Sequence, residues 1–170
     1  AMSLSMYQAS VPVFLRALTN LRAVLQKGEA FAVEKGFEPS VLLNSRLIAD
    51  MFPLTKQVQI ATDMAVRGTS RLAGTEPPSF PDTETDFAGL YARIDRALVV
   101  VRGFGAARLD GSEVRGIDVR RRGRDPLRLD GQSYLLHYLL PNLFFHCTTT
   151  YAILREAGVA LGKDDFMGAS

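Results

Sequence analysis

The first apolar stripe of the chain has the spacing of an amphipathic helix, and consists of Phe14, Leu18, Leu21 and Leu25. Ser10 is a suitable N-cap and Pro12 suits the first turn, so a helix is predicted from Ser10 to about Lys35. Gly36 is its predicted C-terminal stop. Whether residues 2–9 add a further turn or two stays open.

A second long helix is predicted after a short helical turn over residues 39–43. Asp50 is its candidate cap, Pro53 lies in its first turn, and Gly74 ends it. Its apolar face consists of Leu54, Val58, Ala61, Ala65 and Leu72. Three prolines between residues 75 and 82 then exclude helix and indicate a stiff connector.

A third helix is predicted to begin at a capping box formed by Thr83 and Asp86. Its apolar positions follow at intervals of three and four: Phe87, Leu90, Ile94, Leu98 and Val101. Beyond Gly105 the period changes towards alternation around Arg122-Gly123. We therefore expect a short β-hairpin or extended excursion there.

The last long helix is predicted over about residues 132–157, ending at Gly158. It is apolar on nearly every face from Tyr134 to Phe145, which predicts a central position. Leu161 and Phe166 in the tail are candidates for docking on the helices. The pattern predicts an all-α fold, a four-helix bundle with the hairpin inserted before its last helix, as one domain over residues 1–170.

Composition agrees with an ordinary globular domain. The chain has 170 residues, of which 47% are hydrophobic and 22% charged. A chain of this length buries enough surface to fold without disulfide or metal. The single cysteine, Cys147, cannot form an internal disulfide, and no signal peptide or membrane-spanning segment is recognisable, so we expect a cytoplasmic protein. Ala1 before Met2 is typical of a residue left by tag removal.

The positive charge is uneven. The net charge is +2, yet eight arginines lie between residues 102 and 128, with a cluster at Arg120, Arg121, Arg122 and Arg124. This cluster is the one candidate for phosphate or nucleic-acid binding. Nearby aspartates and the lack of interleaved aromatic residues favour a solvated hairpin instead, so nucleic-acid binding is disfavoured.

Two histidines, His137 and His146, are the main candidates for site chemistry. Nine residues of regular helix place them on opposite faces, roughly 13 Å apart along the axis, so they cannot share a metal. His146 shares a face with Asn142, and a partner from the second helix could be Gln57, Gln59 or Asp63, or Asp50 at its start. One imidazole with amides is a weak metal site, and a neutral, hydrogen-bonded core histidine is the alternative.

His137 is predicted to be partly buried, holding a loop or the hairpin. Cys147 beside His146 resembles a thiol and base pair, but adjacent helical residues point about 100° apart, which favours a structural cysteine. No phosphate loop, paired-cysteine motif or serine-nucleophile elbow is present in the sequence.

Three stretches of sequence resemble a bacterial domain-of-unknown-function family. They are Ser5-Met6-Tyr7-Gln8-Ala9-Ser10-Val11-Pro12-Val13-Phe14, Asp50-Met51-Phe52-Pro53-Leu54-Thr55-Lys56-Gln57-Val58-Gln59, and the run from Tyr134-Leu135-Leu136-His137 to Pro141-Asn142-Leu143-Phe144-Phe145-His146. The closing Leu161-Gly162-Lys163-Asp164-Asp165-Phe166 also fits. That family resembles the DinB/YfiT-like superfamily of four-helix bundles. Many members bind a divalent metal through three histidines, and some are metal-dependent thiol transferases.

The resemblance implies a ligand position for each of three residues. Two of the superfamily's histidines stand four apart on the last helix and the third is on the second helix. His146 matches the second of the pair, the first falls on Asn142, and Gln57 is the nearest polar residue on the second helix. Two of the three ligands have therefore changed.

Three hypotheses follow. The first is a small-molecule-binding or interaction protein without the three-histidine site, with a pocket around Gln57, Asn142, His146 and His137, and a homodimer formed through apolar helix faces. The alternative is an enzyme that uses zinc or nickel, bound by His146 with Asn142 and Gln57, and a thiol co-substrate. The third is nucleic-acid binding by the arginine-rich hairpin.

Overall fold

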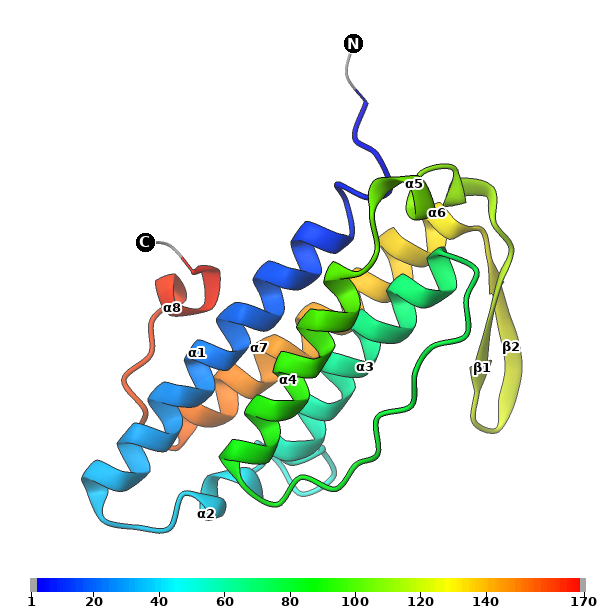
Figure 1. Cartoon of the computed structure of the whole chain (residues 1–170). Coiled ribbons are helices and arrows are strands. Elements are labelled where there is room, and N and C mark those ends of the chain that lie inside the picture. The colour runs from blue at the N-terminus through cyan, green and yellow to red at the C-terminus, as the bar shows by residue number, and fades with distance from the viewer. Residues whose placement is uncertain (1–2, 169–170) are drawn as a thin grey trace.

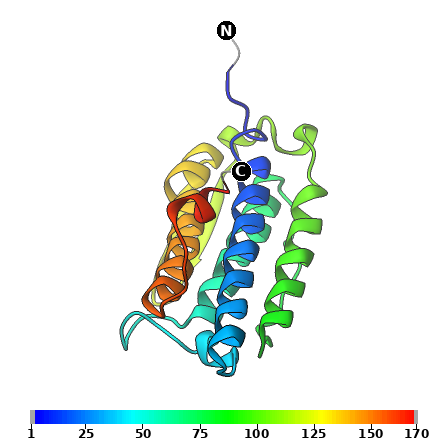
Figure 2. The same ribbon diagram turned by 90° about the vertical axis from the view of Figure 1, so that its left-hand side faces the viewer.

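Four long helices run side by side in the computed structural model, which describes residues 3–168 (Figures 1 and 2). They are α1 (Val11–Lys35), α3 (Leu54–Leu72), α4 (Phe87–Arg102) and α7 (Leu140–Glu156). The expectation for Ala1 and Met2 lies outside the described residues. None of the helices formed by residues 3–168 combines the length and the apolarity that a membrane span requires.

The directions of the four helices determine how they are connected. Helices α1 and α7 run one way and α3 and α4 the other, so neighbouring α3 and α4 are parallel (Figure 1). Short connections serve antiparallel neighbours, whereas parallel neighbours need a long crossover. The proline-rich connector, residues 73–86, is this crossover, and it runs back along the helices from the end of α3 to the start of α4 (Figure 1).

The smaller elements lie between and after the long helices. They are α2 (Ser40–Leu43), α5 (Ala106–Leu109), η1 (Ser112–Val114), β1 (Ile117–Arg121), β2 (Arg124–Leu129), α6 (Gly131–Ser133), η2 (Tyr134–Leu139) and α8 (Lys163–Met167). Segment η2 is π-helical and leads directly into α7. The fold is thus mostly helical with one two-stranded hairpin, as expected.

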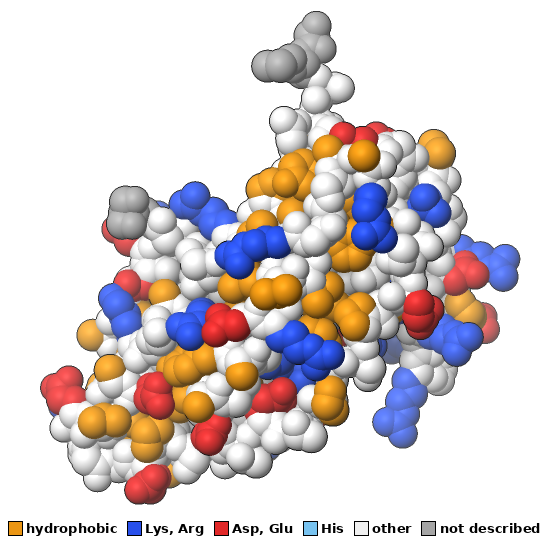
Figure 3. All heavy atoms as spheres, viewed as in Figure 1, with side chains coloured by type: hydrophobic (Ala, Val, Ile, Leu, Met, Phe, Trp, Pro, Cys, Tyr) orange, Lys and Arg blue, Asp and Glu red, His pale blue; other side chains and the backbone are white. Residues whose placement is uncertain are grey.

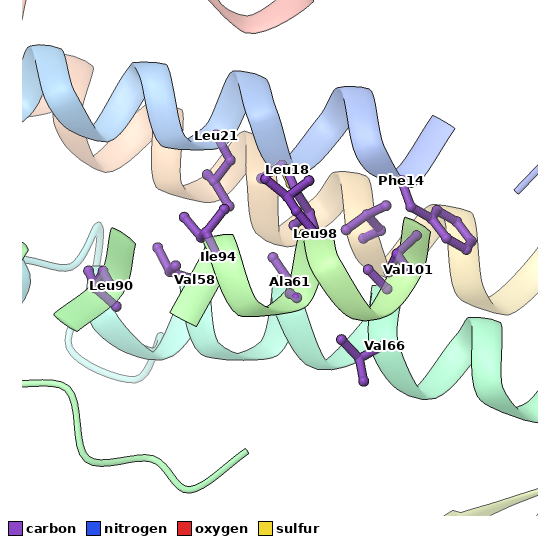
Figure 4. Packing of buried hydrophobic residues seen from close by; sticks show 14 of the residues in the cluster. Phe14, Leu18, Leu21, Val58, Ala61, Val66, Leu90, Ile94, Leu98 and Val101 are labelled. Atoms are coloured by element: carbon purple, nitrogen blue, oxygen red, sulfur yellow. The ribbon is translucent and has the colours of Figure 1, made fainter. Parts of the chain in front are cut away.

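The core forms where the apolar stripes of the four helices meet. Figure 4 shows side chains of α1, α3 and α4 directed towards one another between the helices, among them Phe14, Leu18, Val58, Ile94 and Leu98. All of the apolar positions expected from the helical spacing are buried in α1, α3 and α4. Burying one such side chain contributes about 1.5–3 kcal/mol, so the stripes dominate the stability of the packing.

The helix ends follow the sequence less closely. Gly36 ends α1 in the left-handed conformation, as predicted, with φ 75°. Ser10 does not cap α1, because its hydroxyl donates to the carbonyl of Met6. Asp86, and not Thr83, caps α4 by accepting from the Gly89 N–H. Pro53, and not Asp50, is the N-cap residue of α3.

The last helix differs from prediction in two ways. It begins at Gly131, after the cap residue Asp130, and contains the π-helical segment η2 in place of regular helix. Pro141 accounts for the widened turn, because it has no N–H to donate to the carbonyl of His137. The expected central position is wrong for one face of this helix: Leu136, Phe144 and Phe145 are exposed, because that face points away from the other long helices.

Of the two expected alternatives, a β-hairpin or an extended excursion, the structure has the hairpin. Strands β1 and β2 are antiparallel, with Ile117 opposite Leu129 and Val119 opposite Leu127. Ile117 and Val119 are buried, whereas the arginines are exposed. Figure 3 shows basic and acidic side chains together on the hairpin, and Arg128 lies 3.5 Å from Asp118. The mixed charge agrees with a solvated hairpin.

The crossover connector is fastened by Arg93, whose side chain is 2% exposed. Its guanidinium donates to Asp63 of α3 at 2.9 Å, and to Glu84 and the Pro81 carbonyl of the connector at 3.1 and 3.0 Å. The Nε atom donates to Thr62 at 2.7 Å. Burial raises the pKa of Asp63, although Arg67 and Arg93 both lower it. One α4 side chain therefore binds α3 and the connector together.

We predict that Arg93→Ala lowers the free energy of unfolding by about 3 kcal/mol, because the partly buried carboxylates of Asp63 and Glu84 lose their shared guanidinium and keep only weaker partners. Urea unfolding followed by circular dichroism measures this change. The matched control is Arg128→Ala, which removes an exposed ion pair and should cost less than about 1 kcal/mol. Equal losses in the two variants would show that the buried cluster is not what fastens the connector.

Candidate functional site

His146 of α7 and Gln57 of α3 form a buried pair between two helices that pack closely. The imidazole Nδ1 lies 2.6 Å from Gln57 Oε1. His146 is 8% exposed and Gln57 is 1% exposed. The site follows from the sequence: Gln57 belongs to the first turn of α3, directly after Pro53, and His146 lies in the middle of α7. The structure therefore brings together two of the residues that the resemblance indicated.

The backbone carbonyl of Phe52 fixes the orientation of the Gln57 amide. Gln57 Nε2 donates to this carbonyl at 3.1 Å, so Oε1 is the atom that faces the imidazole. An amide oxygen can only accept, so Nδ1 of His146 carries the proton and Nε2 presents a lone pair. Burial also lowers the pKa of His146, which favours the neutral ring. The pair holds a neutral imidazole in one tautomer.

Asn142 is on the same helix one turn before His146, but its amide nitrogen is engaged elsewhere. Asn142 Nδ2 donates to the carbonyl of Tyr138 at 2.8 Å. Within residues 3–168, no hydrogen bond joins Asn142 to His146 or to Gln57. Asn142 is half-buried and stays a candidate lining residue, apart from the hydrogen-bonded pair.

His137 is exposed, so the prediction that it is partly buried is wrong. It lies in η2 and borders a surface hollow with Glu113 of η1 and Asp130, the cap residue of α6. The end of η2 and the first turns of α7 separate His137 from His146, and the hollow is separate from the Gln57–His146 pair. The structure thus does not bring the fourth predicted residue to the same pocket.

The donor set around His146 does not suit a divalent metal. Within the described part of the chain, no group of three or more His, Cys, Asp or Glu side chains is placed to hold a metal ion. Of the three residues implied by the resemblance, one is an imidazole and two are amides, and both amide nitrogens already donate to backbone carbonyls. Amide oxygen is a weak ligand for zinc or nickel beside imidazole or carboxylate.

Apolar side chains surround the exposed edge of the site. The ring of Phe145 meets that of His146 edge to face, with centroids 5.1 Å apart. A shallow hollow beside them is lined by Leu47 and Met51 of the loop before α3 and by Phe145 and Thr149 of α7. The exposed ring of Phe145 therefore both contacts the imidazole of His146 and lines the hollow.

Cys147 does not take part in this site. It is buried, and burial raises the pKa of its thiol to about 12. A neutral thiol is a poor nucleophile, which agrees with the structural role expected from the sequence.

Sequence reasoning missed two groups: one orients the side chain of Gln57 in the site, and the other fastens the connector to the helices. The Phe52 carbonyl orients Gln57, and no side-chain pattern signals a backbone contact of this kind. Arg93 did leave a signal, since it occupies a core position three residues after Leu90 and four before Ala97. An arginine at such a position indicates a buried counter-charge.

Comparison with known proteins places this geometry in a family. The chain is similar to a crystal structure of a DinB family member protein from Shewanella denitrificans, with a TM-score of 0.87 and 41% sequence identity. The similarity covers 96% of this chain and 92% of that one. No curated protein matches the sequence significantly. Residues 6–167 match the family described as Domain of unknown function (DUF1993). The chain belongs to the DUF1993 family, as the resemblance indicated.

Proposed function

We propose that this protein is a DinB/YfiT-like four-helix bundle that binds a small molecule at His146 without a three-histidine metal site. The observation that carries the proposal is the fixed, neutral imidazole. Nδ1 is occupied by Gln57, whereas Nε2 makes no hydrogen bond within residues 3–168 and the ring is not fully covered. Nε2 is therefore a prepared hydrogen-bond acceptor.

The surroundings define the kind of molecule that fits. Leu47, Met51 and Phe145 offer an apolar surface next to the histidine. A ligand that suits both features has an apolar part and one hydrogen-bond donor, such as a hydroxyl or an amide N–H. Each good hydrogen bond contributes about 0.5–1.5 kcal/mol, so most of the affinity would come from apolar contact.

A second candidate function, a divalent-metal-dependent enzyme with a thiol co-substrate, rests on one observation. Metal-binding histidines usually donate their second N–H to a carbonyl or carboxylate, and the Gln57 oxygen provides such an acceptor for His146. His146 Nε2 would then be the strong ligand and Asn142 a weaker one, while Gln57, the third ligand position implied by the resemblance, orients the imidazole instead of binding the metal. The donor set favours the binding protein over this candidate.

The metal content of the purified protein tests the choice between these functions. After incubation with zinc or nickel and dialysis, we expect far less than one equivalent of metal by mass spectrometry, because a single imidazole binds weakly. His146→Ala should not change the amount. One tightly held equivalent that disappears in His146→Ala would contradict the proposed function and support the enzyme.

A gain-of-function variant provides the positive control. Asn142→His combined with Gln57→His places three imidazoles at the positions implied by the superfamily. Three protein ligands with a water complete a catalytic-type zinc site, so this variant should retain about one equivalent of zinc. Each single substitution should retain much less. Failure of the double variant to bind zinc would argue against the ligand geometry inferred from the resemblance.

The pH dependence of stability tests the neutral imidazole. The folded-state pKa of His146 lies below its ordinary value of 6.5, so the unfolded chain takes up a proton first as the pH falls. The neutral His146 therefore contributes its full share to the free energy of unfolding above pH 6.5. That share is lost as the pH falls from 6.5 towards the lower pKa of the folded state. Urea unfolding across this range should show a shallower pH slope for His146→Gln than for the wild type. His137→Gln is the matched control and should keep the wild-type slope, because its ring is exposed.

A homodimer through apolar helix faces is a separate proposal. Its support is the group of exposed apolar side chains Leu47, Phe144 and Phe145, which line one hollow between α7 and the loop before α3. Light scattering after size exclusion should give twice the chain mass of 18.7 kDa. Phe145→Ser should shift the mass towards that of the monomer, while Val33→Ser, at another exposed apolar position, should not. A monomeric wild type at all concentrations would refute the dimer.

A further inference from the structure

A second, partly open cavity lies next to α7, on the side that faces α1 and α8. It occupies about 180 Å³ between α1, α7 and α8. Helix α1 contributes Leu21 and Val24, α7 contributes Phe144 and Cys147, and α8 contributes Phe166. Eight of its ten lining residues are apolar, and the other two, Arg16 and Asn20, belong to α1.

The two polar lining residues, Arg16 and Asn20, hold α8 over the cavity. Arg16 Nε and Nη2 donate to the carbonyl of Met167 at 3.2 and 3.1 Å, and Asn20 Nδ2 donates to that of Phe166 at 3.2 Å. Lys27 of α1 forms an ion pair with Asp165. Figure 2 shows α8 lying in front of α1 and α7. Because these donors bind the backbone of α8, the remaining wall of the cavity is mainly apolar.

The chemistry of the wall limits what can occupy the cavity. A cationic molecule would lose part of its hydration there and would lie beside the guanidinium of Arg16. Burial keeps the Cys147 thiol neutral, so it offers no counter-charge. The mainly apolar wall gives water few polar partners, so an apolar ring displaces water from it favourably. The size and the wall together fit a single small ring.

We propose that this cavity is a binding site for a neutral, apolar small molecule of about the size of a substituted benzene ring. The site is separate from His146, which does not line it, although Phe144 borders both this cavity and the hollow next to Phe145. An empty cavity of this size weakens the packing, so an occupant of matching size stabilises the fold.

Toluene is the probe that tests this site. In the full-length protein we expect saturable binding by titration calorimetry and a rise in Tm with toluene concentration. In methyl NMR spectra, the shifts should be concentrated on Val13, Val24 and Met167, which line the cavity. Benzylammonium, a cation of similar shape, should not bind at the same concentrations, because it would lose hydration beside the Arg16 guanidinium.

Matched leucine substitutions on α1 locate the site. Ala17→Leu fills the cavity and should raise the Kd of toluene by about tenfold or more, whereas Ala23→Leu, on the exposed side of α1, should leave it unchanged. His146→Ala should also leave toluene binding unchanged, so this inference and the proposed function fail separately.

Two results would overturn the inference. One is the absence of saturable toluene binding to the wild type. The other is wild-type affinity in a folded Ala17→Leu. If Ala17→Leu does not fold, the methyl shifts of the wild type decide: shifts at the cavity residues support the site, and shifts confined to other residues refute it.

Discussion

The arrangement of the helices depends on a buried arginine. Because α3 and α4 run in the same direction side by side, the chain must return along their full length between them, and a connector rich in proline has no backbone hydrogen-bond ladder to hold it there. Arg93 provides the attachment, with carboxylates from α3 on one side and from the connector on the other. A buried ion cluster contributes little net stability compared with apolar packing, but it penalises every arrangement that leaves a charge unpaired. We infer that its main effect is to select this path of the connector.

The helical parts of the fold were predictable because each long helix carries one apolar stripe. Spacing alone located α1, α3 and α4 to within a few residues. The caps were less predictable, since Thr83 and Asp86 are both good cap residues in isolation. Only the packed connector decides that Asp86 meets the Gly89 N–H. The exposure of Phe145 could not be read either, because apolarity does not show which face of a corner helix lacks a neighbour.

The candidate site was partly predictable for the same reason. The contact between Gln57 and His146 follows from two helix positions, and the superfamily spacing identified both. What the spacing could not supply is the state of each group: the tautomer depends on the carbonyl of Phe52, and Asn142 is turned to its own helix by Tyr138. Helix α7 thus presents the His146 imidazole to Gln57 of α3, and it presents Phe144 and Cys147 to the cavity beside α1 and α8.

The π-helical segment η2 has a consequence for how the hairpin is joined to α7. A π turn holds one more residue than an α turn, and it lies between the hairpin and α7. Loss of a residue within Tyr134–Leu139 would restore regular helix and rotate the chain towards the hairpin, while α7 kept its register against α3. Length changes on the hairpin side can therefore be absorbed before they reach His146. The segment thus acts as a spacer between the hairpin and the part of α7 that contacts α3.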